Sequence, residues 1–140
     1  MKRYSPAEAW ALGKTVITAH SGCEETAPNS IEHIKAAIAS GAEMIEFDVR
    51  NIGGVLLLSH DEPEDTTACP TLREAFALVA PAENLHMNID VKTEGLIEGV
   101  MALAKELFSQ VSVTATARSP FPWAAICGAV CGPGRRSPKV

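Results

Sequence analysis

Two acidic residues share one short apolar stretch of the sequence, residues 44–49. Glu46 and Asp48 are two positions apart, so in a β-strand their side chains would point the same way, about 6.6 Å apart along the chain. Neighbouring carboxylates repel each other unless a cation or a shared proton lies between them. Hard divalent cations prefer oxygen ligands, and the pair therefore predicts a divalent-cation site. The simpler alternative is that both carboxylates lie on a solvated face of the strand.

A histidine follows the acidic pair after a predicted turn. Gly53 and Gly54 favour a tight turn, and an antiparallel return over residues 55–59 would bring His60 back beside Asp48. Histidine changes its protonation state near neutral pH and can serve as a general acid or base. Local spacing alone thus predicts an acid pair and a histidine at one place.

Further polar groups follow two other predicted strands. His20 comes after the β-rich run 15–19, and Asp90 and Lys92 stand at the end of the run 86–91. Active sites of parallel α/β folds form at the carboxyl ends of the strands, so we expect these side chains beside the acidic pair. The lysine would offset charge on a phosphoryl group bound to the cation. The alternative is that Asp90 and Lys92 form a plain surface ion pair of little energetic worth.

The elements that must position these residues alternate between helix and strand. Capping boxes at Ser5 and Thr71 open two of the expected helices. Alternation of this kind is typical of a parallel α/β sheet or barrel. Helices are expected over residues 6–12, 31–40, 71–79 and 94–108, and strands over 15–19, 44–49, 55–59, 86–91 and 111–115.

The last part of the chain breaks this alternation. Residues 119–140 hold four of the nine prolines and no acidic residue. We predict an irregular tail there, which is either natural or read outside the original frame. Cys127 and Cys131 stand in this tail at helical spacing, but without two further ligands nearby they do not predict a zinc site.

Composition narrows the class of protein. The 140 residues are 46% apolar and 21% charged, which fits one soluble globular domain. A net charge of −5 argues against a nucleic-acid binder, which needs a basic face. We expect no stable membrane anchoring, because no apolar run approaches about 20 residues, and no secretory signal, because no apolar core follows the basic start. Four scattered cysteines do not suggest a disulfide framework, so a cytoplasmic location is expected.

Taken in order, five short motifs resemble the glycerophosphodiester phosphodiesterase family over roughly residues 15–116. They are His20-Ser21-Gly22, Ala27-Pro28-Asn29-Ser30, Gly41-Ala42-Glu43-Met44-Ile45-Glu46-Phe47-Asp48-Val49, Ser59-His60-Asp61 and Asn88-Ile89-Asp90-Val91-Lys92. The resemblance implies a (β/α)8 barrel that hydrolyses glycerophosphodiesters to glycerol 3-phosphate and an alcohol with a divalent cation, Mg²⁺ or Ca²⁺. It also implies a role for each site residue: His20 and His60 are catalytic, Glu46, Asp48 and Asp90 bind the metal, and Lys92 binds the substrate phosphate.

The motifs depart from the family pattern at three positions. Ser21 replaces an arginine that would grip phosphate with two hydrogen bonds. Pro28 stands where glutamate is frequent, and Asp90 is one methylene shorter than the usual glutamate. These departures bear on substrate affinity and on the geometry of the metal site.

Length is the largest departure, because a (β/α)8 barrel takes about 250 residues. We therefore expect residues 1–118 to form the first half of such a barrel, truncated, with 119–140 as the irregular tail. Open sheet edges and an uncovered apolar face would favour self-association. One alternative function is that of an inactive half barrel, a non-catalytic fragment or binding module. Another is a lipid-cleaving phosphodiesterase on a related barrel.

Two other histidines lie outside the expected site. His33 is expected to face solvent, because it stands beside Glu32 and Lys35 on a predicted helix. His86 begins a predicted strand and is expected to be structural.

Overall fold

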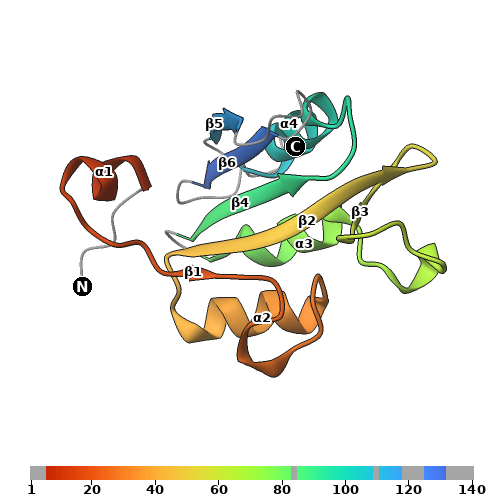
Figure 1. The fold of residues 1–140 in the computed structure, drawn as a ribbon, viewed down its shortest axis with the longest axis horizontal. Helices are drawn as coiled ribbons and strands as arrows, with labels where there is room; N and C mark the ends of the chain where they lie inside the picture. Colours follow the sequence, from red (N-terminus) through yellow and green to blue (C-terminus); the bar gives the residue numbers. More distant parts are fainter. Residues whose placement is uncertain (1–5, 83–84, 109–110, 118–124, 132–140) are drawn as a thin grey trace, which may run out of the picture.

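The computed structural model describes residues 6–82, 85–108, 111–117 and 125–131 (Figure 1). A six-stranded mixed sheet runs in the order β1-β2-β4-β6-β5, with β3 paired to the side of β2. The strands are β1 (Thr18–Ala19), β2 (Met44–Ile52), β3 (Val55–Leu58), β4 (His86–Val91), β5 (Val111–Ala117) and β6 (Ala125–Cys131). The helices are α1 (Pro6–Ala11), α2 (Ile31–Ser40), α3 (Leu72–Val79) and α4 (Ile97–Leu107), with short 3-10 turns η1 (Cys23–Glu25) and η2 (Thr66–Ala68).

Three strands form the parallel part of the sheet. β1 pairs with β2 and β2 pairs with β4, both in parallel, and α2 and α3 lie in the connections between them. The helix boundaries follow their capping residues. The Ser30 hydroxyl accepts the His33 N–H at the start of α2, and Gly41 ends that helix in the left-handed conformation. The capping box predicted at Thr71 opens α3. The predicted helix–strand alternation is therefore confirmed for this part of the chain.

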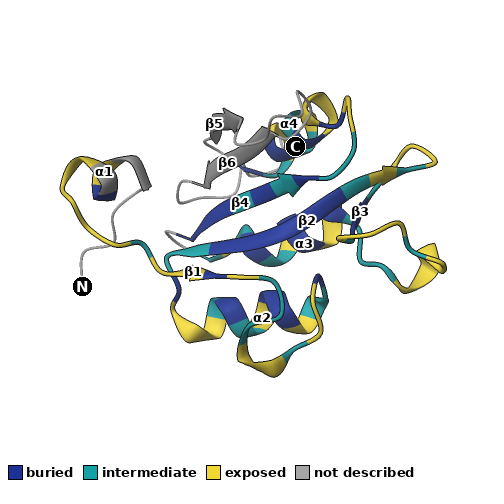
Figure 2. Cartoon of the chain, in the orientation of Figure 1, coloured by how far each residue is buried: buried dark blue, intermediate teal, exposed yellow. Residues whose placement is uncertain are grey.

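Strand β2 presents one apolar face to the core. Figure 2 shows that most of β2 is buried. Ile45, Phe47 and Val49 are fully buried and belong to one core cluster with side chains of the helices, among them Ile34 of α2 and Phe76 of α3. Because alternate residues of a strand point to opposite faces, the carboxylates between them lie on the other face of the sheet. The core packing of β2 thus fixes where its acidic side chains point.

The β2–β3 hairpin differs by one residue from its predicted register. Gly53 and Gly54 both have positive φ, at 59° and 86°, and Ile52 pairs with Val55 across them. A two-residue turn of this kind favours glycine at both positions. The turn is therefore centred between the glycines, and the Ser59 N–H donates to the Asp48 carbonyl at 3.2 Å. The prediction that hairpin pairing places His60 opposite Asp48 was wrong by one position.

The part of the sheet beyond β4 also differs from the prediction of a parallel sheet. β6 lies between β4 and β5 and pairs antiparallel with both, so the sheet is mixed rather than parallel. Residues 119–140 were expected to be irregular, yet they include this strand over Ala125–Cys131. Its sequence is a short apolar run between proline-containing segments, a pattern that suits a strand inside a sheet. The remainder of 119–140 lies outside the described residues.

His86 is buried at the start of β4, as a structural histidine would be. Its Nδ1 has no hydrogen-bond partner among the described residues. Burial lowers the pKa of His86, and the charges of Glu8 and Glu43 oppose this only in part.

Acidification is expected to destabilise the protein through His86. The unfolded chain takes up a proton on this side chain near pH 6.5, whereas the folded chain resists protonation until a lower pH. The contribution to stability is therefore present above about pH 6.5 and is lost as the pH falls below it. Thermal melts from about pH 8 to about pH 5 should show a steeper loss for the native chain than for His86→Gln. Equal slopes for the two proteins would contradict this role.

Candidate metal centre

Three carboxylates converge on one face of β2 and β4, within the part of β2 that pairs with β4. Asp48 and Asp90 are direct partners in the parallel register, and Glu46 lies two residues before Asp48 on the same face. One carboxylate oxygen of each residue lies within 4.8 Å of the others. Glu46 and Asp48 are buried, and Asp90 is half-buried. A cation with ligand distances of about 2.0–2.6 Å suits oxygens at such separations, so the cluster is compatible with a divalent cation.

Lys92 supplies the positive charge beside this cluster. Its Nζ lies 2.7 Å from Asp90 Oδ2 and 3.1 Å from Asp48 Oδ1, and its side chain is 20% exposed. Burial on its own would lower the pKa of Lys92. The hydrogen bonds and charges of Asp90 and Asp48 outweigh that effect and raise the pKa above its ordinary value. Lys92 is therefore a charged ammonium that bridges two carboxylates of the cluster, and it is more enclosed than a plain surface ion pair.

Asn29 binds the carboxylate oxygen of Asp48 that Lys92 does not contact. Its Nδ2 donates to Asp48 Oδ2 at 2.8 Å, and its Oδ1 accepts the Asp48 N–H at 2.9 Å. Asn29 is buried, with a left-handed backbone at φ 56°, a conformation that asparagine tolerates better than most residues. Sequence reasoning gave Asn29 no role at the site. The sequence signal that could have indicated a role for Asn29 is its place in the Pro28-Asn29-Ser30 motif.

The loop after β1 contacts the third carboxylate. The Ser21 N–H donates to Glu46 Oε2 at 3.1 Å, and His20 Nε2 lies 3.6 Å from the same oxygen. Burial raises the pKa of Glu46, the Ser21 hydrogen bond lowers it, and the negative charge of Asp48 raises it again. The net effect is a raised pKa, because burial, together with the negative charges of Asp48 and Asp90, outweighs the Ser21 hydrogen bond and the influence of His20. His20 lies at the rim, with its side chain 81% exposed.

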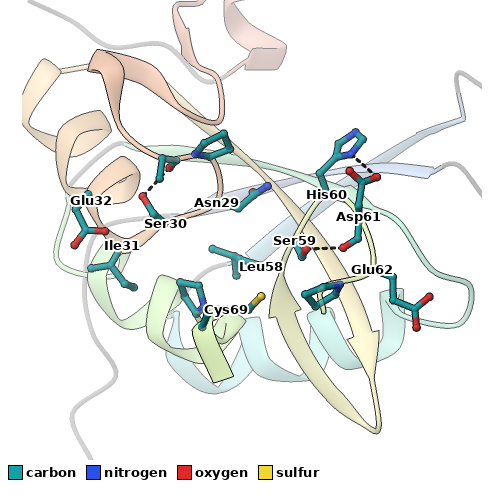
Figure 3. A pocket seen from close by; sticks show the side chains of 15 residues that line it. Asn29, Ser30, Ile31, Glu32, Leu58, Ser59, His60, Asp61, Glu62 and Cys69 are labelled. Atoms are coloured by element: carbon teal, nitrogen blue, oxygen red, sulfur yellow. Dashed lines mark hydrogen bonds and ion pairs between the residues drawn. The ribbon is translucent and has the colours of Figure 1, made fainter. Parts of the chain in front are cut away.

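His60 lies on a groove that does not include the three carboxylates. Its Nδ1 lies 3.1 Å from Asp61 Oδ1, its side chain is 63% exposed, and its carbonyl accepts from Arg50 Nε. Asn29 and His60 both line a groove of about 520 Å³ between residues 27–32 and 58–63 (Figure 3). The structure thus brings His20, Lys92 and the three carboxylates together, and places His60 on the adjoining groove.

His33 corrects an expectation from the sequence. It is fully buried rather than facing solvent. Its Nδ1 accepts the Gly22 N–H at 3.2 Å, and its Nε2 lies 3.0 Å from the Glu46 carbonyl oxygen. The neighbouring Glu32 and Lys35 are exposed, so their polarity correctly marked an exposed face, and His33 stands on the other face of the same helix.

Fold and site together define an α/β protein with an acidic, cation-compatible cluster on one face of its parallel strands. No family model and no curated protein matches the chain. Among solved structures, a glycerophosphodiester phosphodiesterase from Parabacteroides distasonis ATCC 8503 is similar, with a TM-score of 0.51 and 19% sequence identity. The match covers 65% of this chain and 52% of that chain, about half the length of that enzyme. The two proteins therefore share a fold over the matched part. Among the described residues, no helix is both long and apolar enough to cross a bilayer.

Proposed function

We propose that this chain is a phosphoric diester hydrolase that uses a divalent cation to cleave glycerophosphodiesters into glycerol 3-phosphate and an alcohol. The observation that carries the proposal is the cluster of Glu46, Asp48 and Asp90. The cluster stands on a fold shared with part of a glycerophosphodiester phosphodiesterase. The motif order in the sequence, which resembles the same family, supports the same class of substrate.

The three carboxylates are the proposed ligands of the cation, which is Mg²⁺ or Ca²⁺ because both prefer carboxylate oxygens. When bound, the cation would polarise the phosphoryl group and orient it. Lys92 already carries a positive charge between Asp48 and Asp90, and in the complex this charge would stabilise a free phosphoryl oxygen. Asn29 would keep Asp48 oriented through its two hydrogen bonds.

His20 and His60 are the proposed acid and base. Hydrolysis needs one group to take a proton from the attacking water and another to give a proton to the departing alcohol. His20 lies 3.6 Å from Glu46 and is open to solvent, which suits proton exchange with water and substrate. His60 lines the groove beside Asn29, and because Asp61 holds its Nδ1, Nε2 is the ring nitrogen proposed to transfer the proton.

A second candidate function is that of a non-catalytic half barrel that binds a cation without turning over substrate. The observation in its favour is Ser21, which stands where the resembled family has an arginine that binds phosphate. In both candidates we propose residues 1–118 as the barrel-like domain, a cytoplasmic location and a tendency to self-associate through open sheet edges.

Cation dependence separates these candidates. Glycerol 3-phosphate release from glycerophosphocholine should occur with Mg²⁺ or Ca²⁺, stop with a chelator and resume when the cation is restored. Asp48→Asn should weaken cation binding by about 100-fold or more, because altering even a residue behind a metal ligand costs 10–100-fold. Glu106→Gln is the matched control, since this carboxylate is exposed and, within the described part of the chain, forms its ion pair with Arg73 on the surface.

The possible outcomes assign the function directly. Hydrolysis by the native chain and by Glu106→Gln, with loss in Asp48→Asn, supports the phosphodiesterase. Cation binding by calorimetry without product release supports the non-catalytic half barrel. Release that persists after chelation would contradict the cation-dependent mechanism.

A further inference from the structure

We propose that His33 is a positioning residue, which fixes the loop that carries His20 to the metal-ligand strand β2 through both of its ring nitrogens. The effect on turnover rests on the proposed function, whereas the effect on the loop does not. His33 touches no substrate in this proposal and acts only through Gly22 and Glu46.

The hydrogen bonds of His33 fix its tautomer. A backbone N–H can only donate, so Nδ1 must accept the Gly22 N–H at 3.2 Å. The proton of the neutral ring therefore lies on Nε2, which donates to the Glu46 carbonyl at 3.0 Å. The side chain is fully buried on α2, beside core residues such as Ile34 and Ala37. A histidine with both nitrogens bonded in such surroundings connects two segments that an apolar side chain would leave unconnected.

The His33 ring binds a backbone carbonyl of β2 that lies beyond the end of the short strand β1. The Met44 N–H donates to the Ile17 carbonyl on the β1 side of β2. Because alternate residues of a strand direct their backbone groups to the same side, Glu46 and Asp48 also present theirs to that side. β1 ends at Ala19, whose partner is Ile45. Beyond that point side chains replace the strand as hydrogen-bond partners of β2, with His33 on the Glu46 carbonyl and Asn29 on the Asp48 N–H.

The loop that follows β1 needs such support. Glu24, Glu25 and Asn29 have positive φ, between 53° and 60°, and Gly22 has φ 88°. Non-glycine residues persist in this region only where the surroundings determine them strongly. A Cβ at Gly22 would lie 3.3 Å from the Thr26 carbonyl oxygen, so the turn there is also tight.

Two consecutive backbone amides of this loop are linked to Glu46, one to its carboxylate and one to its carbonyl. The Ser21 N–H donates to the Glu46 carboxylate, and the Gly22 N–H reaches the Glu46 carbonyl through the His33 ring. His20 immediately precedes these two amides, and its Nε2 lies 3.6 Å from Glu46. The position of the His20 imidazole relative to the carboxylates therefore depends on the His33 bridge.

Three variants separate the two hydrogen bonds of His33. The amide of His33→Asn falls near the position of Nδ1 and keeps an acceptor for Gly22. The amide of His33→Gln reaches the position of Nε2 and keeps a donor for Glu46, and His33→Leu keeps neither. We expect amide hydrogen exchange at Gly22, measured by NMR relative to the Ile89 amide, to quicken at least about tenfold in the Leu and Gln variants. The Asn variant should stay within about threefold of the native chain.

Turnover gives the second readout. With saturating cation, kcat should fall about 10- to 100-fold in His33→Leu with KM little changed, since misplacing a catalytic group costs rate rather than binding. His33→Asn should recover most of the loss. The matched control is His86→Gln, a second buried histidine at the start of β4 with no hydrogen bond to the loop among the described residues, which should leave Gly22 exchange unchanged.

The outcomes keep this inference distinct from the proposed function. If the native chain shows no hydrolysis, the exchange pattern at Gly22 still supports or overturns the role of His33. Unchanged Gly22 exchange in both Gln and Leu variants would overturn it, as would equal acceleration at Gly22 and Ile89. If His33→Leu fails to fold, the comparison of the Asn and Gln variants decides the question.

Discussion

Replacing His20 by alanine is expected to lower kcat for glycerophosphodiester hydrolysis about 10²- to 10⁴-fold, the range typical of a lost general acid or base. The side chain is 81% exposed, so its removal leaves no cavity in the core. Its Nε2 lies 3.6 Å from Glu46 at the rim of the carboxylate cluster, where a substrate phosphoryl group held by the cluster would meet it. Steady-state kinetics at saturating cation, with release of glycerol 3-phosphate as the signal, provide the measurement.

Two controls separate catalysis from structure in this variant. The melting temperature and the cation affinity of His20→Ala should stay close to native values, since the variant retains all three carboxylates and Lys92. Added imidazole should restore part of the lost rate by supplying the missing acid or base from solution. Turnover equal to that of the native chain would remove His20 from the mechanism.

Replacing Lys92 by methionine is expected to change turnover and cation binding in opposite directions. Turnover should fall about 10²- to 10³-fold, the usual effect of removing one group that stabilises charge in the transition state. Cation binding should tighten about tenfold or more. The Lys92 ammonium lies 2.7 Å from Asp90 and 3.1 Å from Asp48, so it competes with a cation for the same oxygens.

The strength of the charge interaction at Lys92 is large enough to predict a measurable gain in cation affinity. A tenfold change requires about 1.4 kcal/mol, and two unit charges 4 Å apart near a protein surface interact by about 4 kcal/mol. Methionine keeps much of the length and apolar stem of lysine without its charge. Isothermal titration with Mg²⁺ and Ca²⁺ measures the affinity of each variant.

Lys105→Met is the matched control for this experiment. Lys105 is an exposed lysine in the last turn of α4, and its replacement should alter neither cation affinity nor kcat. Weaker or unchanged cation binding in Lys92→Met would show that the ammonium does not compete for the carboxylates. Unchanged turnover would remove Lys92 from the substrate site.

Local sequence signals predicted most of the parallel part of the fold. The capping box at Thr71 acts within a single turn of chain, so the start of α3 could be predicted without tertiary information. The same holds for the carboxylate cluster. Strand alternation places Glu46 and Asp48 on one face, and residues at the ends of neighbouring parallel strands meet at one edge.

These local signals did not predict the register of the β2–β3 hairpin or the burial of His33. The hairpin register differs by one residue from the predicted one, so that Ser59 rather than His60 lies opposite Asp48. The position of His60 depends on the loop after β3, whose path no periodic pattern describes. His33 looked exposed because its sequence neighbours are charged, but its direction on α2 is set by the packing of that helix against the sheet.

The sequence by itself determined which residue types gather on one face of β2 and β4, because strand periodicity and helix capping are local properties. Only the tertiary structure decided what holds them there. β1 pairs with β2 through only two residues, so Asn29 and His33, from the loop and helix that follow β1, complete the hydrogen bonding of β2. The pairing of β6 with β4 likewise depends on the tertiary structure. These are contacts between segments distant in sequence, and they depend on which backbone groups the sheet leaves unpaired.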